Sequence, residues 1–462
     1  MTPSQDRLAA GEPSFWLDAI GDRERRPALI GERAADVCIV GGGFTGLWTA
    51  YELRRAEPNL EVVVLEARRV GFGASGRNGG WVLGKISGSA DAWNHRAPDG
   101  ARRMAAAIQA TVGQIDTVVA RESIDCDWHQ GGTLAVAQSP TELERLRVTA
   151  DAERRALGED LADELLDAGQ LAERVRIDGG LGALYSPHCA RIQPAKLVDG
   201  LTKAVQRAGA TIFESTRVTA IAPGIARTAG GLVRARHVLR ATEGYTADLA
   251  GSRRKLVPIN SSMIVTEPLG QDAWKRIGWE GAETMVDGSH LYTYSQRTAD
   301  GRIAIGGRGV PYRFGSRTDR EGPVPERTVQ ELRGRLAALF PSLVGVPISR
   351  AWHGVLGVSR DWCPAVVHDP ATGLGWAGGY AGDGVAASNL AARTLTDLVL
   401  GRDSELARLP WVGQPARDWE PEPFRFLGAR GIYGLYGIAD RREHGSGRES
   451  RVAALADRIS GR

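Results

Sequence analysis

The N-terminal part of the chain alternates between short apolar runs and glycine-rich turns. Residues Asp36 to Val40 form one apolar run, and Glu61 to Leu65 form a second. Short runs of this kind, without alternating polar residues, are typical of strands that are buried on both faces of a parallel sheet. A helical pattern lies between them, from Leu47 to Arg55. The pattern therefore predicts a strand–helix–strand unit near the start of the chain.

The pattern changes twice in the rest of the chain. Amphipathic helices and short strands come first, and residues 255–310 then show short alternating strands joined by turns, which predicts an antiparallel sheet. Strand, glycine-rich turn and helix return near the end. The predicted elements are helices over 101–122, 140–176 and 326–339, strands over 210–214 and 236–241, and a strand–turn–helix segment over 352–400. The chain thus reads as an α/β protein with an antiparallel insertion.

Length and composition fit a globular protein of two interleaved domains. The chain has 462 residues, of which 42% are hydrophobic and 24% are charged. A net charge of +3, without a dense Lys/Arg run, argues against a nucleic-acid partner. Because neither a signal peptide nor an apolar run of bilayer length is visible, a soluble, cytoplasmic protein without a membrane partner is expected. Buried thiols, rather than disulfides or a metal site, are expected for Cys38, Cys126, Cys189 and Cys363.

The turn after the first apolar run carries a dinucleotide-binding motif. The segment Gly41-Gly42-Gly43-Phe44-Thr45-Gly46 satisfies G-x-G-x-x-G, and Glu66 follows at the end of the next strand. The glycines allow a tight turn, approach of the backbone to a pyrophosphate and close packing of helix on strand. A carboxylate at position 66 accepts hydrogen bonds from ribose hydroxyls and disfavours a 2′-phosphate. FAD or NAD is therefore expected and NADP is not, with an unrelated glycine turn as the weaker interpretation.

A second glycine-rich stretch, residues 71–80, favours FAD over NAD. It offers Ser75, Arg77, Asn78 and Gly79 to the phosphates or the ring of a longer cofactor. NAD-binding proteins rarely need such a loop, and the alternative interpretation is an ordinary surface loop.

At these residues the chain resembles the D-amino-acid-oxidase-like FAD oxidoreductases, and within them the gamma-glutamylputrescine oxidases. The segments that carry the resemblance span about residues 14 to 440 and are DVCIVGGGFTGLWTAYEL, VVVLEARRVGFGASGRNGG, IDCDWHQGGTLAVA, TADGRIAIGGRG, SRDWCPAVV and GGYAGDGVAASNLAARTLTDLVL. The resemblance implies a glutathione-reductase-type, Rossmann-like FAD-binding domain beside a mixed or antiparallel-sheet substrate domain. It also implies oxidation of a C–N bond by hydride transfer to flavin N5, with oxygen reduced to hydrogen peroxide.

The resemblance also suggests domain limits. The expected parts are an N-terminal arm (1–34), a discontinuous FAD-binding domain (35–85, 190–250 and 345–402), a substrate-binding domain (86–189 and 251–344) and a C-terminal extension (403–462).

By the same resemblance, further residues are expected beside the cofactor. Glu66 and Ala67 would lie at the adenosine ribose, Val218 at the adenine, and the segment ending at Gly244 near the pyrophosphate. The helix that starts near residue 384 would direct its positive end at the N1–C2=O part of the flavin. The residues expected on the flavin side are Gly379, Tyr380, Gly382, Asp383, Gly384 and Val385.

Three departures from the family pattern are visible. Gln193-Pro194 stands where relatives often have His-Pro, with Arg191 beside it, and Asp383 stands where histidine is frequent. No cysteine or histidine occupies the positions used for covalent flavin attachment, so non-covalent FAD is expected. The strand 302–307 lacks the lysine that related sarcosine oxidases place near the flavin for oxygen activation, which argues against a fast reaction with oxygen.

Catalytic candidates are His353, Tyr294 and Arg308. A histidine on the strand that faces the flavin in this family could orient substrate or transfer a proton, although a packed histidine is more common. Arg308 faces either the flavin, a substrate carboxylate or solvent. An aromatic cage for an amine is one interpretation, and core packing the other, for Trp81, Tyr292, Tyr294, Trp352 and Tyr380.

These observations favour an FAD-dependent oxidase or dehydrogenase of a small amine, such as a polyamine derivative or an N-alkyl amino acid. The partners expected are that amine and oxygen or another electron acceptor, and the oligomeric state is left open. Two alternatives stay open: an FAD-dependent dehydrogenase of a hydroxy acid or other C–O substrate, and a flavin-binding component of a larger assembly. No metal site is expected.

Overall fold

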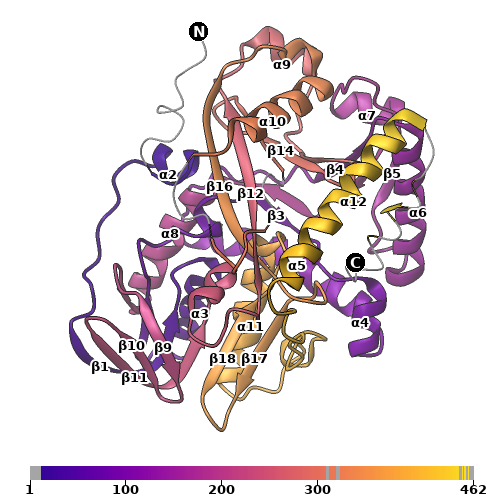
Figure 1. Ribbon diagram of the computed structural model, residues 1–462. Helices are drawn as coiled ribbons and strands as arrows, with labels where there is room; N and C mark the ends of the chain where they lie inside the picture. Colours follow the sequence, from indigo (N-terminus) through magenta and orange to yellow (C-terminus); the bar gives the residue numbers. More distant parts are fainter. Residues whose placement is uncertain are drawn as a thin grey trace.

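Two β-sheets organise the chain (Figure 1). The computed structural model describes residues 12–307, 312–318, 323–446, 450, 452, 453 and 456, and over these residues the strands form two eight-stranded sheets and one two-stranded pair. The first sheet has the order β17-β18-β11-β1-β2-β8, with β10 beside β11 and β9 beside β10. Its strands are β1 (Gly31–Val40), β2 (Val62–Leu65), β8 (Thr211–Phe213), β9 (Val218–Ala222), β10 (Ile225–Thr228), β11 (Gly231–Arg240), β17 (Ala365–Asp369) and β18 (Leu374–Gly378).

The centre of the first sheet is parallel, as the apolar runs predict. β1 pairs in parallel with β2 and β11, β2 pairs in parallel with β8, and β11 pairs in parallel with β18. The last four residues of β1 and all of β2 are buried, which is the burial of a sheet with both faces covered.

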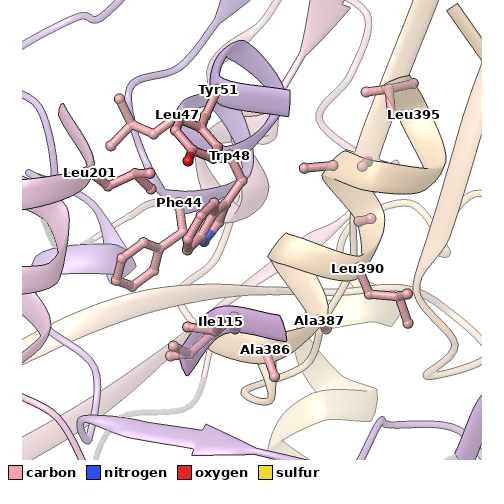
Figure 2. Packing of buried hydrophobic residues seen from close by; sticks show 14 of the residues in the cluster. Phe44, Leu47, Trp48, Tyr51, Ile115, Leu201, Ala386, Ala387, Leu390 and Leu395 are labelled. Atoms are coloured by element: carbon pink, nitrogen blue, oxygen red, sulfur yellow. The ribbon is translucent and has the colours of Figure 1, made fainter. Parts of the chain in front are cut away.

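Helices complete the unit around this sheet. α3 (Phe44–Ala56) connects β1 to β2, and it packs against α8 (Pro194–Arg207) and α11 (Gly384–Val399). Figure 2 shows the aromatic and leucine side chains of α3 on one side of this core and the alanines and leucines of α11 on the other. α3 starts at Phe44, three residues before the predicted Leu47, because the glycine turn itself opens the helix with Gly43 at the N-cap.

The second sheet has the order β16-β12-β15-β14-β13-β4-β6-β5 and is antiparallel except for the parallel pair β13–β4. The expected mixed or antiparallel sheet is therefore confirmed. Its strands are β4 (Thr133–Ala137), β5 (Glu164–Asp167), β6 (Gly182–Ser186), β12 (Val257–Thr266), β13 (Thr284–Asp287), β14 (Thr293–Arg297), β15 (Ile303–Gly307) and β16 (Ile348–Val358). The strand pair is β3 (Trp81–Leu83) with β7 (Cys189–Arg191).

The remaining helices agree in part with the sequence pattern. The helical stretches predicted over 140–176 are two helices with the short strand β5 between them, because Gly158, with φ of +86°, ends one helix and Asp167 starts another with a capping box. The helices are α2 (Phe15–Ala19), α4 (Ala90–Arg96), α5 (Gly100–Arg121), α6 (Pro140–Leu157), α7 (Ala168–Arg174), α9 (Gln271–Ile277), α10 (Glu326–Leu339) and α12 (Phe424–Ser446), with 3₁₀ turns at Ala74–Gly76, Glu243–Asp248, Pro341–Leu343 and Leu406–Arg408.

At two places, strands or helices belong to a different part of the structure than the expected domain limits indicate. β16 falls within 345–402 but pairs along its length with β12 of the second sheet. The expected arm, 1–34, contains α2 and the first residues of β1, and Trp16 of α2 is buried against Trp352. The C-terminal extension contains α12, whose Asp440 accepts the main-chain N–H groups of His290 and Leu291 before β14.

All four cysteines are free and buried. Burial raises the pKa of each thiol to about 12. Within the described ranges, none of the helices combines the length and the apolar character that a bilayer crossing requires.

Candidate cofactor site

At the turn between β1 and α3, three segments of the chain lie so close together that only glycine fits at the contact points. Gly41 has φ of +115°, and a Cβ on it would lie 2.4 Å from the main-chain oxygen of Ala241 at the end of β11. A Cβ on Gly46 would lie 2.0 Å from the oxygen of Gly41. The first glycine thus allows the turn to pass β11, and the last allows α3 to pack on β1.

The first turn of α3 contains no acidic residue, so the positive end of the helix dipole is not neutralised from within the helix. Gly43 at the N-cap has no side chain to accept the free N–H groups. The hydroxyl of Ser75 accepts the N–H of Phe44 at 2.8 Å, so the second glycine-rich stretch lies directly over this turn. Such a helix end attracts an anion through its N–H groups and its dipole.

Glu66 lies at the end of β2 beside the same turn. Its Oε2 accepts the N–H of Gly42 at 2.8 Å, and its Oε1 accepts the N–H of Arg68 at 2.8 Å. Burial raises the pKa of Glu66, against the opposing effect of these two bonds. The main chain therefore holds the carboxylate at the position where the motif predicts a ribose-binding acid.

A cavity of about 650 Å³ runs from this turn to the N-terminus of α11. It is lined by parts of the first sheet, the segment that follows β11, and Val355 and Leu356 of β16. The predicted cofactor residues that line it are Gly41, Gly43, Phe44, Thr45, Glu66, Ala67, Ser75, Asn78, Val218, Tyr380, Gly382, Gly384 and Val385. One cavity thus collects residues that are more than 340 positions apart in the sequence.

Several predicted residues lie next to the cavity but not on its lining. Arg77 is buried, and its guanidinium donates to the main-chain oxygen of Phe72 at 2.7 Å and of His353 at 3.3 Å. Its nitrogens therefore connect the loop to β16. The other predicted residues outside the lining are Gly46, Gly79, Gly244, Gly379 and Asp383.

The N-terminus of α11 forms the far end of the cavity. Asp383 stands at the N-cap without capping the helix through its side chain, and the first turn of α11 has no acidic residue. Tyr380, just before it, places its hydroxyl 3.1 Å from the hydroxyl of Thr45 on α3. Burial raises the pKa of Tyr380, so this hydroxyl stays protonated and joins the two helix N-termini.

Comparison with known proteins decides the family. A family model described as FAD dependent oxidoreductase, of the DAO type, matches residues 36–398. The chain belongs to the DAO family. A gamma-glutamylputrescine oxidoreductase of Escherichia coli (strain K12) is 33% identical over 415 residues, which are 88% of this chain and 93% of that protein. A glycine oxidase of Geobacillus kaustophilus (strain HTA426) is 25% identical over 387 residues, which are 81% of this chain and 96% of that protein.

The fold agrees with this assignment. A crystal structure of glycine oxidase from Geobacillus kaustophilus matches with a TM-score of 0.69 at 22% identity, over 83% of this chain and 99% of that one. The predicted fold class is therefore confirmed, and the chain is an FAD-dependent oxidoreductase of the DAO family.

The cavity of this DAO protein fits FAD. It contains two helix N-termini whose first turns lack acidic residues, a carboxylate held at the end of β2, and apolar walls at Leu65 and Val218. A cofactor with a diphosphate, a ribose and flat rings requires this set of groups.

The aromatic candidates separate into different places. Trp81 and Tyr294 are half-buried, their rings meet edge-on at 6.1 Å, and the Tyr294 hydroxyl lies 2.8 Å from that of Ser261. Trp352 packs with Phe15 and Trp16 in the core, and Tyr294 packs against the same cluster. Tyr292 precedes β14, and Tyr380 lines the cavity. Tyr294 therefore connects Trp81 with the cluster that contains Trp352, while Tyr380 lies at the cavity.

Among the described catalytic candidates, His353 does not line the cavity. His353 is buried on β16, opposite Ser262 of β12, and its main-chain oxygen accepts from Arg77. Arg308 lies outside the described residues.

The resemblance placed residues 241–244 near the pyrophosphate, and Ala241, Thr242 and Glu243 do line the cavity, whereas Tyr245, residues 247–251 and Arg217 were not predicted to lie there. After β11 the chain folds over the cavity through Thr242, Glu243, Tyr245 and residues 247–251, and Arg217 precedes β9. The usable signal was Glu243, a carboxylate directly after a predicted strand in an otherwise uncharged Ala-Thr-Glu-Gly-Tyr segment.

Proposed function

We propose that this protein oxidises a C–N bond of a small amine, such as a polyamine derivative or an N-alkyl amino acid. The observation that carries the proposal is the 33% identity to a gamma-glutamylputrescine oxidoreductase over most of both chains. Two further relatives, a glycine oxidase and a sarcosine oxidase subunit beta of Rhodobacter capsulatus, are also named for amines or amino acids. We assign the first sheet to FAD binding and the second to substrate binding.

When bound, FAD supplies a hydride acceptor at its N5. The protein contributes the positions of the reacting groups and a site that excludes water. In this proposal the N-terminus of α3 and Glu66 bind the diphosphate and the ribose, and the N-terminus of α11 faces the end of the flavin where negative charge collects.

The aromatic pair Trp81 and Tyr294 is the proposed wall for the amine. Trp81 directly follows the loop 78–80 and its ring meets that of Tyr294. Tyr294 faces the same loop, since a Cβ on Gly79 would lie 3.0 Å from the Tyr294 ring. An apolar wall favours the neutral amine, which is the form that releases a hydride, and a π face accepts the cationic form during binding.

We further propose that FAD is held without a covalent bond and that oxygen is the electron acceptor, giving hydrogen peroxide. Among the described lining residues there is neither a cysteine nor a histidine. Because β15 carries no lysine, we expect the reaction with oxygen to be slow. Acid precipitation is expected to release all flavin into the supernatant, whereas flavin retained in the pellet would contradict the non-covalent assignment.

The substrate proposal is tested by anaerobic mixing of the holoprotein with amines and with hydroxy acids while the flavin absorbance is followed. Bleaching by amines alone is expected, and bleaching by hydroxy acids alone would contradict the proposal. Peroxide release in air then distinguishes an oxidase from a dehydrogenase.

Variants of Tyr294 make the same experiment specific to the proposed wall. Tyr294→Leu is expected to raise the amine concentration that gives half-maximal flavin reduction, by up to about tenfold. Tyr294→Phe keeps the ring, and its value is expected to stay near that of the wild type. Equal behaviour of the two variants would remove Tyr294 from the proposed site.

A further inference from the structure

A carboxylate outside the dinucleotide motif joins three segments at the edge of the cavity. Glu243 follows β11 and lines the cavity. Its Oε2 accepts the N–H of Gly379 at 3.0 Å, and its Oε1 accepts the N–H of Tyr380 at 3.1 Å. The main-chain N–H of Gly357 on β16 donates to the same carboxylate. One side chain thus connects the first sheet, the second sheet and the turn that leads into α11.

The backbone around Glu243 is shaped to admit its carboxylate. A Cβ on Gly357 would lie 2.7 Å from Oε2 of Glu243, and a Cβ on Gly378 would lie 3.0 Å from the same atom. Glu243 itself has φ of +44°, which residues other than glycine rarely adopt. Such strain persists where the surroundings determine the conformation, and it is common at ligand sites.

The turn that Glu243 supports has little shape preference of its own. Gly379 and Gly382 have φ of +82° and +124°, in the region that glycine enters freely. Tyr380, Gly382 and Gly384 of this segment line the cavity. The two bonds to Glu243 therefore restrain the backbone at that end of the cavity, together with the bond from the Ala381 N–H to the Gly357 oxygen at 3.1 Å.

The carboxylate has partners for its charged form. Burial raises the pKa of Glu243 to about 7, against the effect of its N–H donors and of Arg240. Burial also lowers the pKa of Arg240 to about 10, and the guanidinium donates to Thr246 at 2.7 Å. The side chain is thus held by donors from β16 and the turn before α11, with the charge of Arg240 nearby.

We propose that Glu243 is a positioning residue of the FAD site, which fixes the turn before α11 by accepting the N–H groups of Gly379 and Tyr380. The proposal rests on FAD binding and not on the substrate that is oxidised, so its test needs no substrate.

The test compares Glu243→Gln with Glu214→Gln. Glu214 is a matched control because it is 3% exposed, accepts the N–H groups of Val70 at 2.8 Å and Arg26 at 3.1 Å, and does not line the cavity. Glutamine keeps one acceptor and turns a donor toward the other N–H group.

FAD-free protein is titrated with FAD by flavin fluorescence, and the visible spectrum of the bound flavin is recorded. Glu243→Gln is expected to raise the dissociation constant about tenfold or more and to shift the flavin absorption band, while Glu214→Gln changes neither beyond about twofold. Equal dissociation constants and spectra for the two variants would overturn the proposal.

A second pair of variants leaves Glu243 in place. Gly357→Ala directs a methyl group at the Glu243 carboxylate, whereas Gly375→Ala on β18 directs one at Leu239, 2.8 Å from its Cδ2. Both substitutions crowd a strand, but the proposal predicts a loss of FAD affinity of about tenfold for Gly357→Ala only. The same FAD affinity in both variants would contradict the assigned role.

Discussion

Replacing Gly46 with alanine perturbs the cofactor site through packing alone. The new Cβ would lie 2.0 Å from the main-chain oxygen of Gly41 and 3.3 Å from Cγ2 of Ile39. Real Cβ atoms essentially never approach a neighbour closer than 3.0 Å, so α3 must move away from the turn by at least 3.0 − 2.0 = 1.0 Å. The contact is backbone on backbone, and no side chain can rotate to relieve it.

The size of the effect follows from this displacement. Overpacking a tight contact costs about 1–3 kcal/mol in the free energy of unfolding, against a total of about 5–15 kcal/mol for an ordinary domain. The displacement also moves the N–H groups at the start of α3, whose geometry defines the anion site. A loss of about 1.4 kcal/mol there weakens FAD binding tenfold.

Gly113→Ala is the matched control. Gly113 lies in α5 and is exposed, and a methyl group at this position would meet no other atom within 4 Å. This variant is expected to gain up to about 1 kcal/mol, because alanine favours the helix more than glycine does. Urea unfolding of the FAD-free proteins and FAD titration measure both effects. A Gly46→Ala protein that is as stable and binds FAD as tightly as Gly113→Ala would refute the packing argument.

Three further outcomes follow from individual groups. Tyr380→Phe removes the hydroxyl that contacts Thr45 and is expected to lower the unfolding free energy by about 1 kcal/mol in urea unfolding; an unchanged midpoint would contradict this. The raised pKa of Glu243, about 7, means that the folded state keeps a proton that the unfolded state releases near 4.5. This group therefore lowers the unfolding free energy as pH rises from about 4.5 to 7, by at most about 3.4 kcal/mol, and a pH series of Glu243→Gln should lack that decrease. Native protein should resist a thiol reagent that reacts with four thiols after unfolding, and rapid labelling of native protein would contradict the burial of Cys38, Cys126, Cys189 and Cys363.

The first βα unit was predictable because its signals are local. Strand, turn, helix and acid lie in one continuous segment from residue 36 to 66, and each has its own pattern in the sequence. The helix 326–339 was predicted to the residue for the same reason.

The missed features depend on contacts between distant segments. Glu243 bonds to Gly379, which is 136 residues further on, and no local pattern contains that contact. β16 belongs to the second sheet because β12, about ninety residues earlier, is its partner. Sequence spacing does not give the direction of a side chain, so the bonds from the Arg77 guanidinium to the main-chain oxygens of Phe72 and His353 could not be predicted.

α12 was missed because its own residues favour it weakly. It contains Gly428, Gly431, Gly434 and Gly437, and glycine disfavours a helix interior by about 1 kcal/mol relative to alanine. Contacts with the rest of the chain support it, including an ion pair between Glu443 and Arg145 at 3.1 Å.

The most direct test of the account is a titration of FAD-free protein with FAD, for wild type, Glu66→Gln and Glu61→Gln. Glu61 is exposed and immediately precedes β2, so its variant controls for the substitution itself. We expect one FAD per chain in wild type and in Glu61→Gln, and about tenfold weaker binding in Glu66→Gln, whose carboxylate the turn holds. Wild-type protein that takes up no FAD, or a Glu66→Gln protein that binds it as tightly as Glu61→Gln, would contradict the assignment of this cavity to the cofactor.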